Sequence, residues 1–265
     1  MMQYGISTIV LGRTDLEPAL RRIAAAGFTQ IEILAEPPHL APGNLDPQKV
    51  RAWLDELGLA ARVGHGIYSY QTPNCGALDE AERRRSVRFV ATCFEPLAAV
   101  GAQFIVLHPT GYSLDYTADK RQKVLDQASK SMDELATLGA RAGIRIAWEN
   151  LPHHGTERPL HDMTELRALI DDLPEHVGLC LDTTHALIAG HDPVEQLEVA
   201  FDRLFCLHLH DSDGEGDCHW VPGRGVIDWQ GFIARLDERC FAGTRTIEVM
   251  STDETEDEVL AQALA

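Results

Sequence analysis

Short apolar runs alternate with longer segments of helical periodicity along the whole chain. Runs of this length, rich in Val and Ile and bounded by polar residues, are typical of buried strands. The eight strand candidates are residues 3–10, 29–34, 60–66, 103–109, 144–150, 177–182, 204–210 and 244–250. The chief helix candidates between them are residues 15–27, 46–58, 79–101, 119–143 and 192–201.

This alternation of strands and helices predicts a parallel sheet. Eight such units in about 250 residues are typical of a (β/α)8 barrel, whereas an open doubly wound sheet usually has fewer strands and a glycine-rich first turn. Neither a GxGxxG motif nor a P-loop occurs in the sequence. The predicted fold is therefore α/β, a single-domain (β/α)8 TIM barrel that covers residues 1–265.

Chemically active side chains recur where the predicted strands end. In a (β/α)8 barrel the active site forms at the carboxyl ends of the strands. Six of the eight predicted strands carry a histidine or an acidic residue there: His65, His108, Glu149, Asp182, His208 and Glu248. Three further candidates follow closely after strand ends: His185, Asp217 and His219.

The period of two along a strand indicates where these side chains point. In residues 206–210, Leu207 and Leu209 share one face, while His208 and His210 share the other. The leucines are expected to face the helices and the histidines the barrel axis. A single histidine after an apolar run is more often a hydrogen-bonded structural residue, but six strands with such residues favour a metal site. Carboxylates and imidazoles together suit Mn²⁺, Mg²⁺, Co²⁺ or Zn²⁺.

Charge and composition narrow the choice of partners. The formal net charge of −18 disfavours a broad basic surface for nucleic acid. A small carbohydrate substrate is expected instead, and a homo-oligomer is compatible with the sequence. No apolar run is long enough to span a membrane, no signal peptide is recognisable, and the six cysteines form no CxxC pair. These features predict a cytoplasmic protein with reduced thiols.

Five motifs resemble the xylose-isomerase-like barrel superfamily over nearly the whole chain. They are HPTG (108–111), ENLP (149–152), CLDTTHALIAG (180–190), HLHDSDGEGDCHWVPGRGVIDW (208–229) and IEVM (247–250). The superfamily includes sugar and sugar-phosphate isomerases and epimerases, and also the endonuclease IV type of DNA repair enzyme. The resemblance therefore implies two alternative activities.

The two branches imply different metal centres. The isomerase branch implies one divalent metal held by Glu149, Asp182, His208 and Glu248, with His185 near the substrate oxygens. The endonuclease branch implies three zinc ions and nine ligands, which add His65, His108, His185, Asp217 and His219 to the same four residues. All nine are present. The repair enzymes usually have HLND and ENTAGQG where this chain has HLHD and ENLPHHG, which favours a sugar isomerase or epimerase and leaves an abasic-site endonuclease as the alternative.

For the isomerase reading we expect proton transfer through an enediolate. Glu149 and Glu248, on strands five and eight, would act as an acid/base pair on opposite sides of the substrate. His210 and Asp211 are expected to orient a metal ligand. Arg224, in the loop 222–225, either holds a substrate hydroxyl or phosphate group or is an exposed turn residue.

Overall fold

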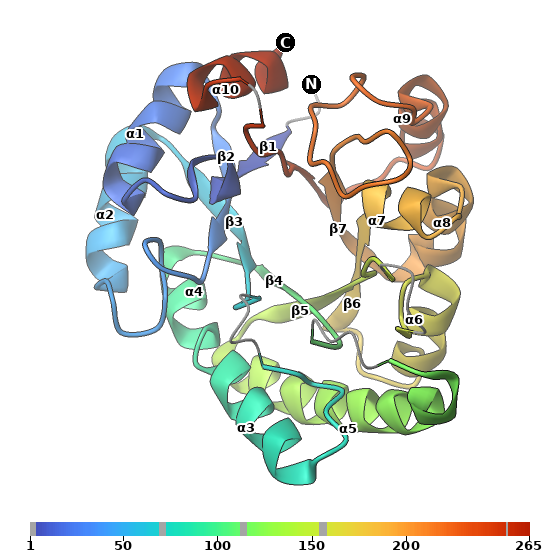
Figure 1. Ribbon diagram of the computed structural model, residues 1–265. Coiled ribbons are helices and arrows are strands. Elements are labelled where there is room, and N and C mark those ends of the chain that lie inside the picture. The colour runs from blue at the N-terminus through green and yellow to red at the C-terminus, as the bar shows by residue number, and fades with distance from the viewer. Residues whose placement is uncertain (1–3, 69–72, 112–115, 154–157, 253) are drawn as a thin grey trace.

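The computed structural model describes residues 4–68, 73–111, 116–153, 158–252 and 254–265. Eight parallel strands close into a barrel in sequence order, because β1 pairs with both β2 and β8 (Figure 1). The strands are β1 (Gly5–Ser7), β2 (Gln30–Leu34), β3 (Ala60–His65), β4 (Phe104–Leu107), β5 (Arg145–Glu149), β6 (Val177–Asp182), β7 (Leu204–Leu209) and β8 (Thr244–Ile247). The predicted (β/α)8 TIM barrel is confirmed.

Helices surround the barrel on the outside (Figure 1). The α-helices are α1 (Leu16–Ala26), α2 (Pro47–Leu57), α3 (Glu80–Ala91), α4 (Phe94–Val100), α5 (Ala118–Ala142), α6 (Met163–Ile170), α7 (Thr183–Ile188), α8 (Pro193–Ala200), α9 (Trp229–Glu238) and α10 (Glu256–Leu264). Their ends follow local sequence signals. Asp46 accepts a hydrogen bond from the backbone of Gln48 at the start of α2, and Gly27 adopts a left-handed conformation after α1.

Two predicted elements differ from the structure. The run 3–10 was expected to be one strand, but its second half is a 3-10 helix, η1 (Thr8–Leu11), whose first turn is capped by the Ser7 side chain. The helix expected over 79–101 is two helices that meet at Thr92 and Cys93. Pro96 explains the break, because its ring cannot donate the backbone hydrogen bond that a continuous helix requires and is tolerated only in a first helical turn.

The apolar residues form two separate cores. The larger core lies between the strands and the helices and includes Leu207, Leu209 and Ile247, as the strand periodicity predicts. The smaller core fills the inside of the barrel with Val63, Phe104, Val106, Ala147, Cys180, Phe205 and Cys206. Apolar side chains fill the interior of the barrel, so the polar groups of the site lie above this core, at the carboxyl ends of the strands.

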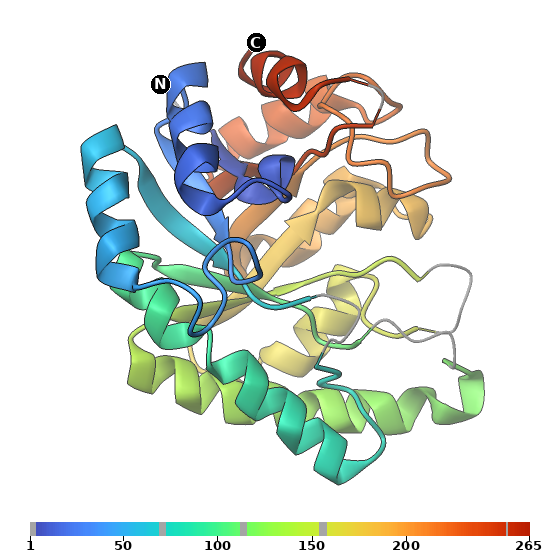
Figure 2. The same ribbon diagram turned by 60° about the vertical axis from the view of Figure 1, so that its left-hand side comes forward.

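The loops that follow the strands gather at the carboxyl end of the barrel. Figure 2 shows the long loop between β7 and α9, in orange, on the same side as the loop that follows β5. All six cysteines are free, and four of them are buried. Among the helices that the structure describes, none combines the length and apolarity needed to cross a lipid bilayer.

Candidate functional site

Glu149, at the end of β5, is the centre of the site. Its Oε1 lies 3.0 Å from Nδ1 of His208, and its Oε2 lies 3.1 Å from Nε2 of His108 and 3.5 Å from Nε2 of His65. All four side chains are nearly inaccessible to solvent. The ligand atoms of His65, His108 and Glu149 lie within 4.8 Å of one another, and we call these three residues the inner group.

A second group shares Glu149. Nδ1 of His208 is also 3.2 Å from Oε2 of Glu248 and 4.0 Å from Oδ2 of Asp182. Glu149, Asp182, His208 and Glu248 form a buried set whose ligand atoms lie within 4.8 Å of one another, and we call it the tetrad. The tetrad unites the ends of β5, β6, β7 and β8, as the sequence predicts.

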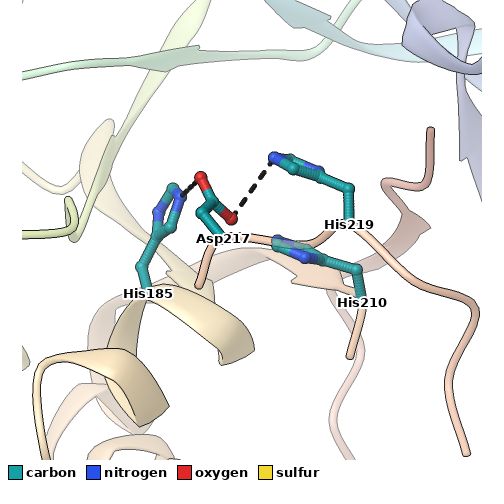
Figure 3. Close-up of side chains that lie close together, drawn as sticks. All are labelled: His185, His210, Asp217 and His219. Atoms are coloured by element: carbon teal, nitrogen blue, oxygen red, sulfur yellow. Dashed lines mark hydrogen bonds and ion pairs between the residues drawn. The ribbon is translucent and has the colours of Figure 1, made fainter. Parts of the chain in front are cut away.

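A third group lies beside the tetrad and connects the start of α7 with the loop after β7. Oδ2 of Asp217 is 3.3 Å from Nε2 of His185, and its Oδ1 is 3.4 Å from Nε2 of His219 (Figure 3). We call these three residues the outer group. The ring of His210 stacks on that of His219, with centroids 4.1 Å apart, and its ligand atom also lies within 4.8 Å of those of the outer group.

Hydrogen bonds fix the orientation of the imidazoles. Nδ1 of His65 lies 2.8 Å from the carbonyl oxygen of Gly66, and Nδ1 of His185 lies 2.9 Å from that of Asn150. His219 repeats the arrangement, with Nδ1 2.9 Å from the carbonyl oxygen of Glu248. Because a carbonyl oxygen only accepts hydrogen bonds, Nδ1 carries the hydrogen in each ring. The Nε2 atom of each ring is then the one directed at a carboxylate.

His208 has the other tautomer, with the hydrogen on Nε2. Its partner is Glu32, a residue that the sequence analysis did not identify. Nε2 of His208 lies 2.9 Å from Oε2 of Glu32 on β2, so Nε2 donates the hydrogen bond and Nδ1 faces the tetrad. Glu32 is fully buried. A usable signal existed, because Ile31 and Ile33 face the helices and strand alternation therefore directs Glu32 into the barrel. Carboxylate–histidine pairs of this kind set the tautomer and basicity of metal-binding imidazoles.

Replacing Glu32 with Gln should weaken metal binding by roughly 10- to 100-fold, as is usual when such an outer carboxylate is lost. The amide keeps the size of the side chain but removes the charge that supports His208. Competition against a chelator of known affinity measures the change. Glu175→Gln, at an exposed position, is the matched control and should bind metal as the wild type does. Wild-type affinity in Glu32→Gln would show that Glu32 only packs.

Three acidic residues of the site, Glu149, Glu248 and Asp217, are ionised at neutral pH. Burial alone would raise the pKa of Glu149, but the surrounding imidazoles outweigh burial and lower its pKa well below the ordinary value. The pKa of Glu248 is lowered against the same burial, mainly by His208. Burial is likewise outweighed at Asp217, whose pKa is lowered well below its ordinary range by His185 and His219.

The imidazoles show the reverse effect. Burial opposes their protonation, but the carboxylates raise the pKa of His65 to about 9, that of His185 to about 10 and that of His219 to about 9. The pKa of His208 is raised well above its ordinary value, again against burial. His108 is the exception, since burial outweighs Glu149 and lowers its pKa to about 4.

These groups fit divalent cations. A ring nitrogen without hydrogen, directed at a carboxylate, is repelled unless a positive charge lies between them, and either a proton or a metal ion supplies that charge. Oε2 of Glu149 is buried and accepts no hydrogen bond of acceptable angle from the described residues, although two imidazoles are near it. Mixed nitrogen and oxygen ligands suit Zn²⁺, Co²⁺ or Mn²⁺.

We expect the metal-free protein to lose stability as the pH rises from about 6.5 to 10. His65, His185 and His219 have folded-state pKa values of about 9 to 10, above the ordinary 6.5. The folded state therefore binds more protons than the unfolded state in this window, and the stabilisation present below pH 6.5 disappears as the rings deprotonate. Urea unfolding at several pH values measures the trend. Metal-saturated protein is the control and should show a smaller loss, and an equal loss in both forms would contradict the assignment.

Hydrogen bonds with three residues, His185, His210 and Asn150, hold Asp182 in position. Its Oδ1 accepts a hydrogen bond from the backbone N–H of His185 at the start of α7, and its Oδ2 lies 2.7 Å from Nε2 of His210. Asn150 accepts a hydrogen bond from the backbone N–H of Asp182 and donates one to its carbonyl oxygen. His210 thus lies where the sequence places it, beside a candidate metal ligand, whose orientation it fixes.

Asp211 differs from its expected role, because it organises the loop after β7 and contacts no candidate ligand in the described structure. Its carboxylate accepts hydrogen bonds from the backbone of Gly223 and Gly225 and from the Trp229 side chain. A Cβ atom at Gly225 would lie 2.0 Å from the carbonyl oxygen of Ser212, so only glycine fits this approach.

Arg224 is part of the same loop. Its guanidinium lies 4.9 Å from the ring centroid of Trp220 and forms an ion pair with Glu254. It is therefore held between the loops that follow β7 and β8, and its part in substrate binding stays a prediction.

Comparison with known proteins gives this arrangement a context. Residues 20–265 match the family described as "Xylose isomerase-like TIM barrel". The chain belongs to this family. The assignment agrees with the resemblance seen in the sequence motifs.

Members of the xylose isomerase-like TIM barrel family that resemble this chain differ in function. Endonuclease 4 of Thermus thermophilus is 28% identical over 81% of this chain and 78% of its own length. Protein MJ1311 of Methanocaldococcus jannaschii is 26% identical over 93% of this chain and 83% of its own. A crystal structure of a D-tagatose 3-epimerase-like protein superposes with a TM-score of 0.84 and 24% identity, covering 99% of this chain and 97% of that one.

Proposed function

We propose that the protein is a divalent-metal-dependent isomerase or epimerase of a carbohydrate or carbohydrate phosphate. The observation that carries the proposal is the tetrad, in which two carboxylates, one from the end of β5 and one from the end of β8, both lie close to Nδ1 of His208. Oε1 of Glu149 lies 3.0 Å from this nitrogen and Oε2 of Glu248 lies 3.2 Å from it. Sugar 3-epimerase structures share the fold over nearly the whole chain, which supports the proposal without deciding the substrate.

The tetrad has the groups that the chemistry requires. Moving a carbonyl, or inverting the carbon beside it, begins with removal of a weakly acidic proton. A divalent cation bound by the tetrad, such as Mn²⁺, Mg²⁺, Co²⁺ or Zn²⁺, supplies stabilisation of the negative charge that develops on the substrate oxygen. Glu149 and Glu248 are ionised at neutral pH because of the adjacent imidazoles, so either can accept the proton.

The two glutamates divide the proton transfer between them. We assign removal of the proton to one carboxylate and return of a proton on the opposite face of the carbon to the other. The other two members of the tetrad are held in place from outside it: His210 contacts Asp182, and Glu32 contacts His208. His185, whose Nε2 lies 3.3 Å from the partly exposed Asp217, is assigned to a substrate oxygen.

A second candidate function is hydrolysis of a phosphodiester, as in an abasic-site endonuclease. The inner and outer groups favour it, because with the tetrad they bring together all nine residues that three metal ions would require. The similarity to endonuclease 4 of Thermus thermophilus points the same way. The acidic charge of the chain, −18, disfavours a nucleic-acid substrate.

One pair of assays separates the two candidates. Metal-saturated protein is incubated with a panel of ketose epimers, free and phosphorylated, and with a duplex that contains one abasic site. Interconversion of a ketose pair with an intact duplex is the expected result. Cleavage of the duplex, with three zinc ions per chain and no sugar interconversion, would assign the hydrolytic function.

A further inference from the structure

A separate cluster of possible ligands lies between the start of α6 and the turn that precedes α8. His161 and Asp162 directly precede α6, and His191 lies in the turn between α7 and α8. None of the three residues belongs to the tetrad, the inner group or the outer group. The helices α6 and α8, whose beginnings they adjoin, lie side by side on the outside of the barrel (Figure 1).

The spacing of the two imidazole nitrogens matches a tetrahedral cation, and the carboxylate oxygen lies slightly farther away. Nε2 of His191 lies 3.4 Å from Nδ1 of His161, and the latter lies 3.9 Å from Oδ2 of Asp162. Two nitrogens bound to one tetrahedral Zn²⁺ at about 2.0–2.1 Å are about 3.3–3.4 Å apart. The three ligand atoms all lie within 4.8 Å of one another.

The backbone holds these residues in place before any ion binds. Oδ1 of Asp162 accepts a hydrogen bond from the backbone N–H of Glu165, which leaves Oδ2 on the side of His161. The backbone N–H of Met163 donates to the buried side chain of Gln196 on α8, so the start of α6 is tied to its neighbour. An ion would therefore meet a largely organised set of ligands, at a small entropic cost.

The turn that carries His191 is equally defined. Gly190 has a φ of 84°, a left-handed conformation that glycine adopts without strain, and the backbone N–H of His191 donates to the carbonyl oxygen of Ala186. The side chains of His161 and Asp162 are 24% and 14% exposed. The cluster is thus open enough for an ion and a water molecule to enter.

The chemistry of the ligands selects the ion. Two imidazoles and one carboxylate favour Zn²⁺, Co²⁺, Ni²⁺ or Cu²⁺ over Mg²⁺ or Ca²⁺, which prefer oxygen ligands only. The ring of His153 lies edge-on to that of His161, with centroids 5.7 Å apart, so a third imidazole borders the cluster. His153 follows Glu149 by four positions, on the loop that leaves β5.

We propose that His161, Asp162 and His191 form a second, peripheral site for a divalent transition-metal ion. The ion would clamp the end of the loop between β5 and α6 to the turn between α7 and α8. Because the site shares no residue with the tetrad, the proposal does not depend on the function proposed above. Its effect is on stability: an ion that binds only the folded chain raises the free energy of unfolding as its concentration increases.

The test counts zinc ions. Wild-type protein, His191→Asn and the double variant His161→Asn/His191→Asn are equilibrated with the same buffered free Zn²⁺ concentration, and bound zinc is measured per chain. His176→Asn is the matched control, because the His176 side chain is also half-buried and its Nε2 lies 2.9 Å from the carbonyl oxygen of Ala136, away from the cluster. We expect the double variant to bind one zinc ion fewer than the wild type and the control.

Thermal unfolding gives a second measurement. The rise in Tm between low and high free Zn²⁺ should be smaller in both cluster variants than in wild type and His176→Asn. Equal zinc counts in wild type and the double variant would overturn the proposal. So would the loss of one zinc ion from His176→Asn as well, since the loss would then not be specific to the cluster.

Discussion

Replacing Glu149 with Gln is expected to lower turnover by roughly 100-fold or more, the contribution typical of a positioned proton acceptor. The amide retains an oxygen and the size of the side chain but accepts a proton poorly. Glu149 also contacts His65, His108 and His208, and the substitution removes its negative charge from all three contacts at once. Steady-state kinetics at saturating metal measure the change.

Glu248→Gln should show a comparable loss if the two glutamates act as a pair. The control is Glu175→Gln, the same replacement at an exposed position, which should retain wild-type turnover. Metal content must be measured in each variant, because the prediction concerns activity with metal still bound. Near-normal turnover of Glu248→Gln would show that the paired-carboxylate assignment is wrong.

Removal of bound metal by a chelator is expected to abolish activity, and Mn²⁺, Co²⁺, Mg²⁺ or Zn²⁺ should restore it. The reason is electrostatic: without a cation, the negative charge that develops on the substrate oxygen faces the ionised carboxylates of Glu149 and Glu248. Activity is measured before chelation, after dialysis and after titration with each metal. Full activity in a preparation that metal analysis shows to be metal-free would contradict the proposed function.

Asp182→Asn separates metal affinity from proton transfer. Asp182 contributes an oxygen to the tetrad and is oriented by His210, but it is not assigned a proton. Its variant should therefore bind metal weakly and recover part of its activity in excess metal. Excess metal should not rescue Glu149→Gln or Glu248→Gln.

The sequence predicted the barrel because alternation and strand periodicity are local properties of the chain. It also located the ends of β3 to β8, where candidate ligands such as His65, His208 and Glu248 have ligand atoms within 4.8 Å of one another. The sequence also contains the signal for the break between α3 and α4, since Pro96 restricts a continuous helix by a known steric rule. The short 3-10 turn after β1 was not, because Thr8 to Val10 have strand-like composition.

Contacts across the barrel were harder to predict. Glu32 and His208 are 176 positions apart, and only the closed sheet brings them to 2.9 Å. The role of Asp211 depends on how the loop 222–229 folds back, which no periodicity encodes. The same holds for His161 and His191, which meet because α6 and α8 pack together.

The fate of the substrate hydrogen tests the account most directly. A ketose interconverted in the panel assay is incubated with metal-saturated protein in deuterated water, and deuterium at the carbon beside the carbonyl is followed by NMR. Proton transfer through Glu149 and Glu248 predicts that this carbon gains deuterium during turnover, because a carboxylate exchanges its proton with solvent. Retention of the original hydrogen through complete interconversion would show a hydride shift and would contradict the proposed mechanism.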